Sequence, residues 1–301
     1  MPSLRGRIVQ SLMRVSLSRM EGNHSIMESR AELDALAEKW IRPPKKVTMR
    51  TILADNVPSE WLEPCNLDTQ RVILYLHGGG YTICSPATHR MLTSHLALLA
   101  QARLLVPAYR LAPEYPFPAA LEDALTAYHW LLKQGVLPEH IAIGGDSAGG
   151  GLTVSTAVSL RDAGEPLPAA LFLISPWTDL TFSGESYHTR RKVDPIFSKE
   201  HGGPDFVPAY VGKDNPANPL ISPLFADLQD LPPMLIHVGD HEVLLNDSTL
   251  LAERAKGAQV NVEIEIWEGM WHVWHVFAPY VPESQRAIEQ IGAFIQRHLA
   301  E

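Results

Sequence analysis

The feature that most constrains the fold of this chain is the pentapeptide GDSAG at 145–149. An apolar run precedes it at 141–144, and a second apolar stretch follows it to about residue 160. These patterns predict a buried strand, a tight turn and a helix. The flanking glycines lack a Cβ atom, so strand and helix can approach closely around Ser147, which is held in a strained backbone.

Strands and helices alternate along the remaining chain. The expected strands are 46–54, 71–77, 102–108, 141–146, 170–175, 233–238 and 260–267, and the expected helices are 119–134, 148–162, 244–256, 284–298 and one after Pro86. This order favours an α/β fold with a mainly parallel sheet covered on both faces. Residues 177–230 are rich in Pro, Gly and Asp, so we expect an insertion of short helices and loops there.

The composition excludes several classes of protein. The 301 residues, 46 % of them hydrophobic, can bury one large core. A net charge of −9 argues against a nucleic-acid partner. The two cysteines, Cys65 and Cys84, provide no disulfide framework, and a cytoplasmic location is the simplest expectation. We expect no metal and no cofactor, because the sequence contains no cluster with metal-ligand spacing.

The first 42 residues have the pattern of amphipathic helices. Polar residues interrupt any signal-peptide core, and no apolar run approaches the roughly 18 residues of a membrane span, so no membrane insertion is expected. Apolar residues fall at helical spacing in two sets, Leu4, Ile8 and Leu12 in one and Val9, Met13, Leu17 and Met20 in the other. We expect them to pack on the protein's own body; a membrane-surface helix is the alternative.

Candidate reactive groups follow several of the predicted strands, whose carboxyl ends meet at one edge of the sheet. The glycines of 77–80 (HGGG) expose backbone N–H groups that can stabilise a developing oxyanion together with the N–H of Ala148. His272 lies on the loop after the last strand, as expected for a general base, and His275 lies a turn further. The order serine, acid, histidine is that of an α/β-hydrolase. The carboxylates that compete for the acid position are Asp240, Glu242 and Asp247.

Five motifs resemble the bacterial hormone-sensitive-lipase family of α/β-hydrolases, the HGGG-containing carboxylesterases. They are 77–81 (HGGGY), 109–114 (YRLAPE), 145–150 (GDSAGG), 175–179 (SPWTD) and 271–274 (WHVW). The resemblance extends from about residue 45 to the C-terminus. It implies an eight-stranded sheet in a catalytic domain at 43–301, with a helical cap formed by 1–42 and by an insertion at about 180–215.

The resemblance also implies a serine carboxylesterase for short-chain acyl esters that acts through an acyl-enzyme. Ser147 would be the nucleophile and His272 the base, and the N–H groups of Gly79, Gly80 and Ala148 would form the oxyanion hole. The family often carries aspartate at the acid position. Alignment on the following leucine and polar pair places Glu242 there, and we favour it over Asp240.

Other residues are assigned to the pocket or to the scaffold. The candidate pocket aromatics are Tyr81, Trp177, Phe206, Tyr210 and Trp274, and core packing is the alternative for each. We expect Glu114 and Asp123 to hold the HGGG loop and neighbouring turns, Asp179 to cap the start of the insertion, and Asp194 to lie in the cap.

Three other functions use the same fold. An amidase, lactonase or carbohydrate deacetylase would use the same residues, and a lipase would act at an oil–water interface. A non-catalytic small-ligand receptor of this family would lack the histidine, whereas His272 is present. A homodimer through the edge strand at 260–267 is also a candidate arrangement.

Overall fold

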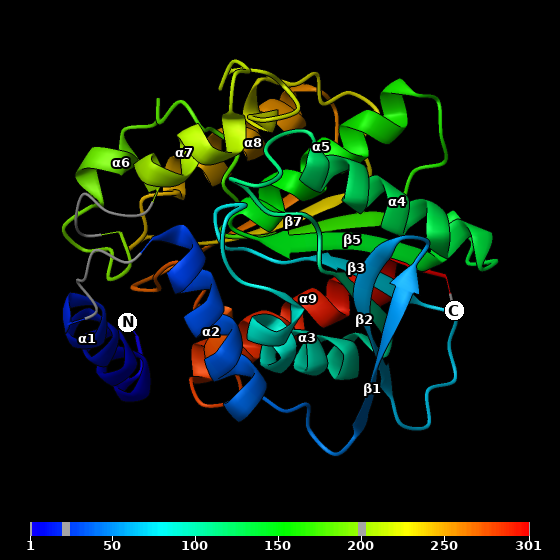
Figure 1. Cartoon of the computed structure of the whole chain (residues 1–301), viewed down its shortest axis with the longest axis horizontal. Helices are drawn as coiled ribbons and strands as arrows, with labels where there is room; N and C mark the ends of the chain where they lie inside the picture. The colour runs from blue at the N-terminus through cyan, green and yellow to red at the C-terminus, as the bar shows by residue number, and fades with distance from the viewer. Residues whose placement is uncertain (1, 20–24, 198–202, 301) are drawn as a thin grey trace.

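A computed structural model describes residues 2–19, 25–197 and 203–300 (Figure 1). One eight-stranded sheet has the order β1-β2-β4-β3-β5-β6-β7-β8. The strands are β1 Val47–Ala54, β2 Val57–Pro64, β3 Val72–Leu76, β4 Arg103–Pro107, β5 Ile141–Asp146, β6 Ala170–Ile174, β7 Met234–Gly239 and β8 Val262–Trp267. The pairs β1–β2 and β2–β4 are antiparallel and the other pairs are parallel. The mainly parallel, eight-stranded prediction is therefore confirmed.

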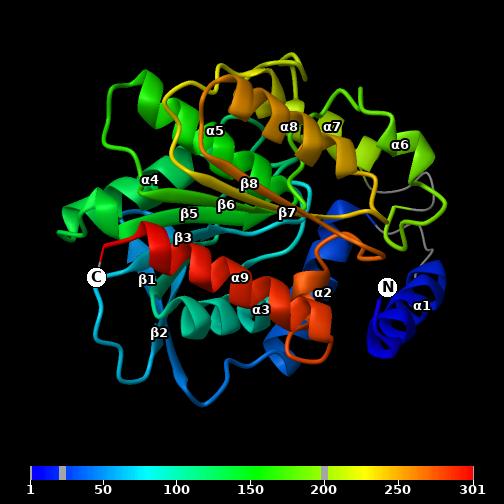
Figure 2. The same ribbon diagram turned by 180° about the vertical axis from the view of Figure 1, so that it is seen from behind.

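Helices cover both faces of this sheet (Figures 1 and 2). One face carries α4 Ala119–Lys133, α5 Ala148–Asp162 and α8 Leu245–Gly257, and the other carries α3 Pro86–Ala100 and α9 Pro282–His298. Each face has its own buried apolar cluster. The central strands β3, β5, β6 and β7 are buried along their whole length, which explains why they are continuous apolar runs in the sequence.

Four further helices lie at one end of the sheet (Figures 1 and 2). They are α1 Leu4–Arg19, α2 Ile26–Trp40, α6 Ser186–Thr189 and α7 Gly203–Val211. Three short 3-10 helices complete the described structure, η1 Pro138–His140, η2 Pro223–Phe225 and η3 Trp274–Phe277. None of the helices in the described ranges is long and apolar enough to cross a bilayer.

A row of three charged residues attaches α2 to the rest of the molecule. Arg30, Asp34 and Glu38 are spaced by four residues, so they lie along one side of the helix. The Arg30 guanidinium pairs with both oxygens of Glu114 and also donates to the carbonyls of Thr82 and Ala112. Glu114 is thus connected to the loop that follows the glycines through Arg30, and its expected direct support of the HGGG loop stays a prediction.

The other two residues of the row bind the start of α3. Asp34 accepts a hydrogen bond from the Ser85 hydroxyl at 2.6 Å. The Arg90 guanidinium bridges Glu38 and the buried carboxylate of Glu60. Because Glu60 belongs to β2, this bridge connects α2 to the sheet through α3.

Two expectations differ from the structure. Strand β2 is absent from the predicted strands, because its sequence, VPSEWLEP, is polar and carries two prolines. The apolar residues of α1 are expected to pack inward, and Val9 and Met13 do so, whereas Leu4, Ile8 and Leu12 are exposed. Met20 and the side chain of Leu17 lie outside what the structure describes.

Strand β8 is an edge of the sheet, and the homodimer through it stays a prediction.

Candidate active site

Ser147 occupies the turn between β5 and α5, in a backbone conformation that side chains rarely adopt (φ 53°, ψ −122°). Its N–H donates to the Ile174 carbonyl at 2.9 Å, and its carbonyl accepts from the Trp177 N–H at 2.8 Å. A Cβ at Gly149 would lie 1.9 Å from the Leu76 carbonyl oxygen, and one at Gly145 would lie 2.3 Å from it. Only glycine therefore permits this close passage of α5 over the end of β3.

His272 and Glu242 form a buried pair on two neighbouring loops. The His272 Nδ1 lies 2.9 Å from Glu242 Oε2. The other carboxylate oxygen accepts hydrogen bonds from the Ser175 hydroxyl at 2.8 Å and the Gly239 N–H at 2.6 Å. When Nδ1 donates to the carboxylate, Nε2 is left as the proton acceptor of the imidazole.

The carboxyl end of β6 joins the serine turn to the histidine loop. Ile174 binds the Ser147 N–H, while the Ser175 hydroxyl donates to Glu242 and accepts from the Val273 N–H at 3.1 Å. Two consecutive residues at one strand end thus contact the serine turn, the acid and the histidine loop. The sequence motif at 175–179 includes Ser175 but gives no sign of this contact.

The rival carboxylates have other partners. Asp240 accepts from the Gly269 N–H at 2.5 Å, and its carboxylate lies 4.0 Å from His241. Asp247 accepts from the backbone N–H groups of Thr178 and Asp179 at 2.8 and 2.9 Å. Of the three candidates, Glu242 is the one whose carboxylate contacts His272.

The pKa of His272 reflects opposing influences. Burial disfavours the charged imidazole, but the hydrogen bond and charge of Glu242, with the charges of Asp194 and Asp146, outweigh it and raise the pKa above the ordinary value of 6.5. Asp194 is itself fully buried, in the predicted cap insertion. It accepts from the N–H groups of Ile196 and Phe197 and from the Val243 N–H at 2.9 Å.

Asp146, the second residue of the pentapeptide, holds the start of the glycine loop. Its carboxylate accepts from the Gly78 N–H at 3.0 Å and the Tyr75 hydroxyl at 2.7 Å, and lies 3.2 Å from His89 Nε2. Burial disfavours charge on His89, but the Asp146 carboxylate outweighs this and raises the pKa of His89. Sequence reasoning missed both Asp146 and His89; the only signal was the acidic residue before the serine.

The glycines of the loop are required by its geometry. Gly79 and Gly80 have positive φ angles of 111° and 61°. A Cβ on Gly79 would meet the Ile83 carbonyl at 2.1 Å, and one on Gly80 would meet the Phe206 ring at 2.2 Å. His77 begins this loop, and burial lowers the pKa of its imidazole to about 3, so the ring is neutral. The ring stacks on that of Tyr109, with centroids 4.3 Å apart.

Four of the five candidate pocket aromatics lie near this loop. Tyr81 stacks on Tyr210 with ring centroids 3.7 Å apart, and Trp177 is 6.4 Å from Tyr81. Phe206 lies against Gly80. Trp274 differs: it is fully buried beside His275 and Trp267, in a separate apolar cluster. Core packing, the alternative weighed for each aromatic, thus describes Trp274, and the pocket assignments stay predictions.

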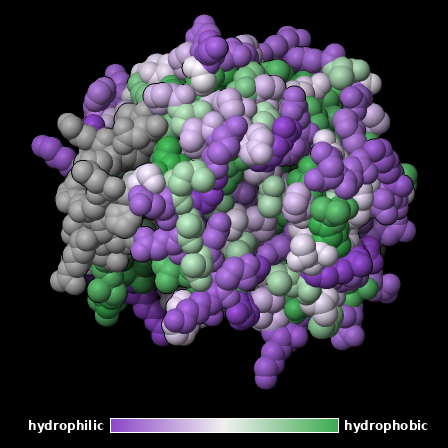
Figure 3. All heavy atoms as spheres, in the orientation of Figure 1, coloured by the Kyte–Doolittle hydropathy of each residue, from purple (hydrophilic) through white to green (hydrophobic). Residues whose placement is uncertain are grey.

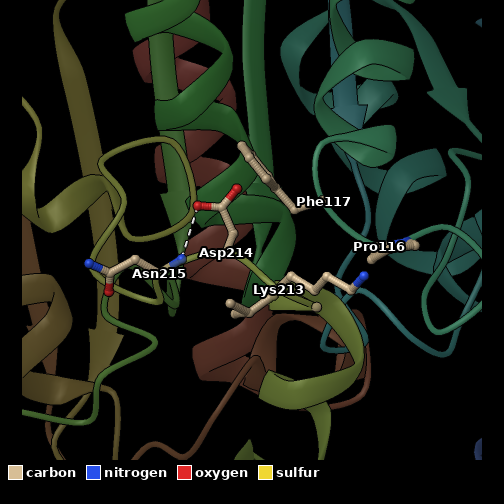
Figure 4. A pocket seen from close by; sticks show the side chains of 7 residues that line it. Pro116, Phe117, Lys213, Asp214 and Asn215 are labelled. Atoms are coloured by element: carbon tan, nitrogen blue, oxygen red, sulfur yellow. Dashed lines mark hydrogen bonds between the residues drawn. The ribbon is translucent and has the colours of Figure 1, made fainter.

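A surface pocket of about 600 Å³ lies next to this group (Figure 4). It is lined by Pro116, Phe117, Val211, Gly212, Lys213, Asp214 and Asn215. The Phe117 and Tyr210 rings form a T-shaped contact with centroids 6.1 Å apart, so the pocket adjoins the aromatic group but does not include Ser147, Glu242 or His272. Among the described residues there is no group of three or more His, Cys, Asp or Glu side chains able to hold a metal ion.

Burial raises the pKa of Asp247 to about 8, because its buried carboxylate has few donors to offset the lost hydration. Between the ordinary pKa of 3.8 and this raised pKa, the folded state binds a proton that the unfolded state has released. The free energy of unfolding therefore falls as pH rises from about 4 to about 8. Asp247→Asn keeps an acceptor for both N–H groups. We expect it to be more stable than the wild type at about pH 8, by at least about 1 kcal/mol more than at about pH 5.

Urea unfolding at the two pH values measures this difference. Asp240→Asn is the matched control, since Asp240 lies seven residues earlier and its carboxylate is one-third exposed. Identical pH dependence in Asp247→Asn and the wild type would contradict the assignment.

The fold is that of an α/β-hydrolase. Residues 73–276 match the family described as having the alpha/beta hydrolase fold. The chain is 46 % identical over 243 residues to an acetyl-hydrolase of Streptomyces hygroscopicus, covering 81 % of each chain. It is 36 % identical over 268 residues to an esterase of Acinetobacter venetianus (strain RAG-1), covering 88 % of this chain and 87 % of that protein.

Solved structures of esterases are also similar to this chain. An esterase from the bacterial hormone-sensitive lipase family is 41 % identical with a TM-score of 0.91, and the match covers 100 % of both chains. EstE5, whose crystal was soaked with p-nitrophenyl butyrate, is 38 % identical with a TM-score of 0.93, over 98 % of this chain and 99 % of that one. The chain thus belongs to the α/β-hydrolases and, among them, to the bacterial hormone-sensitive-lipase esterases. Its reaction class is carboxylic ester hydrolysis.

Proposed function

We propose that the protein is a serine carboxylesterase that hydrolyses short-chain acyl esters with Ser147, His272 and Glu242. The observation that carries this proposal is the buried hydrogen bond between Glu242 and His272, which fixes the imidazole tautomer in which Nε2 accepts a proton. It occurs beside a strained serine turn at the same edge of the sheet. Backbone strain at a serine beside this pair supports a catalytic use.

In the proposed reaction, His272 takes the Ser147 proton as the hydroxyl oxygen attacks the ester carbonyl. The N–H groups of Gly79, Gly80 and Ala148 bind the negative oxygen of the tetrahedral intermediate. His272 then gives the proton to the leaving alcohol, and the acyl group stays on Ser147. A water molecule, deprotonated by His272, releases the acid and restores the serine.

Helices α1, α2, α6 and α7 form the proposed cap at this end of the sheet. Phe206, which belongs to α7, lies against Gly80, and the Tyr81–Tyr210 stack is buried beside it. These rings fill space next to the proposed oxyanion donors. We therefore expect short acyl groups to be preferred, with Trp177 and the three rings as pocket walls.

A panel of p-nitrophenyl esters from acetate to palmitate tests the proposal, together with labelling by a serine-reactive sulfonyl fluoride. The expected result is fastest turnover at short chains, with turnover lost as Ser147 is modified and the adduct located by peptide mass mapping. Turnover that persists in fully labelled protein, or an adduct on another serine, would contradict it. Faster hydrolysis of emulsified long-chain triglyceride than of butyrate would indicate a lipase.

A second candidate is an acetyl esterase for a larger acetylated molecule. The similarity to the acetyl-hydrolase of Streptomyces hygroscopicus favours it. The two candidates differ in their alcohol group, because an acetyl esterase of this kind depends on contacts to the leaving group. Acetylated sugars, compared with p-nitrophenyl acetate by kcat/KM, separate them; lactones and amides belong in the same comparison.

The raised pKa of His272 sets the acid limb of the pH profile. Protonated His272 cannot accept the serine proton, so kcat/KM should fall about tenfold per pH unit below a midpoint higher than 6.5. Asp194→Asn removes a negative charge that favours the imidazolium, so this midpoint should move to lower pH. The exposed Asp227 provides the control variant, Asp227→Asn. A midpoint that does not move in Asp194→Asn would contradict the role of Asp194.

A further inference from the structure

Helix α1 has one face attached to the protein and one face without a covering element among the described residues. On the attached face, Val9 and Met13 pack on the Trp271–Trp274 cluster. The Ser3 N–H and hydroxyl donate to the Glu283 carboxylate at 2.7 and 2.8 Å. These contacts hold the helix in one orientation on the start of α9.

The opposite face carries a stripe of aliphatic side chains. Leu4, Ile8 and Leu12 are 66 %, 50 % and 63 % exposed. At 100° per residue they lie within an arc of about 80°. Three aligned aliphatic side chains facing solvent on one short helix differ from the scattered exposed apolar residues that any protein has.

Arginines flank this stripe on both sides. Arg5 lies on one flank, and Arg7 and Arg14 lie on the other, all three exposed. The helix sequence, LRGRIVQSLMRVSLSR, has four arginines and no acidic residue, within a chain of net charge −9. An apolar stripe between cationic flanks is the pattern of a helix that lies in the headgroup region of a lipid layer.

An exposed tyrosine lies close in sequence to the point where α1 is attached. Tyr280 is 64 % exposed, three residues before the Glu283 that holds Ser3. Tyrosine suits a membrane–water interface, because its ring is apolar and its hydroxyl is polar. In Figures 1 and 3 the helix lies at the margin of the molecule, where hydrophobic residues reach the surface, at the same end of the sheet as the proposed cap.

We propose that the Leu4–Ile8–Leu12 stripe and its flanking arginines dock the protein on an anionic lipid surface. The aliphatic side chains enter the boundary between headgroups and acyl chains, and Arg5 and Arg7 contact phosphate groups, whereas the Arg14 guanidinium donates to the Val193 carbonyl at 2.6 Å. The charge of α1 selects the anionic lipid, because the rest of the chain is acidic and is repelled by it. Docking in this orientation places the proposed cap, and not the opposite end of the sheet, at the lipid.

Co-sedimentation of the full chain with vesicles tests this proposal. One set contains phosphatidylcholine with about 30 % phosphatidylglycerol, and the other contains phosphatidylcholine alone. We expect clear binding to the anionic vesicles, weak binding to the neutral ones, and release at high salt. The double variant Ile8→Gln/Leu12→Gln should bind at least about tenfold less, and Arg5→Gln/Arg7→Gln should lose the preference for anionic lipid.

The matched control is Leu53→Gln/Leu137→Gln, which removes two side chains that are 64 % and 49 % exposed elsewhere on the surface. It should bind as the wild type does, and all variants should hydrolyse a dissolved acetate ester equally well. Absence of binding to anionic vesicles, or equal binding by the Ile8/Leu12 variant, overturns the proposal. A further result would also overturn it: the wild type does not bind vesicles, and light scattering gives the Ile8/Leu12 variant a lower molar mass than the wild type. That result would assign the stripe to contact between copies of the chain.

Discussion

Ser147→Ala is expected to lower kcat/KM for a short-chain p-nitrophenyl ester by at least about 10⁴-fold. The change removes the attacking oxygen, and no acyl-enzyme can form. Binding should be retained, because alanine keeps the Cβ and the backbone contacts of the turn to Ile174 and Trp177. Loss of a covalent intermediate is measured directly by the disappearance of the burst of p-nitrophenol and of the acyl adduct in intact-protein mass spectra.

Ser155→Ala is the control for this experiment. Ser155 is buried two turns along the same helix, and its hydroxyl has no hydrogen-bond partner among the described residues. Its removal should leave the activity and the melting temperature nearly unchanged. If Ser147→Ala retained more than about a hundredth of the activity, another nucleophile would have to carry the reaction.

Glu242→Gln is expected to lower kcat by about 10³-fold with little effect on KM. The glutamine oxygen can replace one acceptor, but its amide N–H₂ cannot accept from the imidazole Nδ1–H. Either the acceptor for Ser175 and Gly239 or the acceptor for His272 is lost. The imidazole then loses its orientation and the charge that stabilises its cation.

Asp240→Asn serves as the comparison, since it is the rival acid two residues away. Its carboxylate caps the Gly269 N–H, and asparagine keeps an oxygen there. We expect less than about a threefold change in kcat. The opposite ranking, with Asp240→Asn the more severe change, would reverse the assignment of the acid. Far-UV circular dichroism of both variants separates a catalytic loss from unfolding.

The central strands and the helices on both faces could be predicted from the sequence because each is a long apolar or amphipathic run with clear end signals. Strand β5 and helix α5 begin and end at the predicted residues. Strand β2 could not be predicted in this way, because its burial comes from pairing with β1 and β4 and not from an apolar sequence.

In the candidate site, too, features set by local sequence could be predicted, and features set by tertiary contacts could not. Glycine and serine motifs are local in sequence, so the loop and the turn could be placed in advance. The acid could only be ranked, because three carboxylates occur within eight residues and their directions depend on the backbone of one turn. The pocket aromatics could only be listed, because nearness to His272 in sequence says nothing about which side of the histidine loop the Trp274 ring faces.

Arg30, the first residue of the row on α2, connects the segment after the glycines to a helix residue 52 positions earlier in the sequence. A single guanidinium from α2 holds the carbonyls of Thr82 and Ala112, which belong to two separate loops. The N-terminal segment is thus part of the framework around the proposed active site, and a shortened chain that begins after it would lose the Arg30 contacts to these two loops. Sequence variation on α2 can likewise alter the behaviour of the loop while every residue of the loop stays the same.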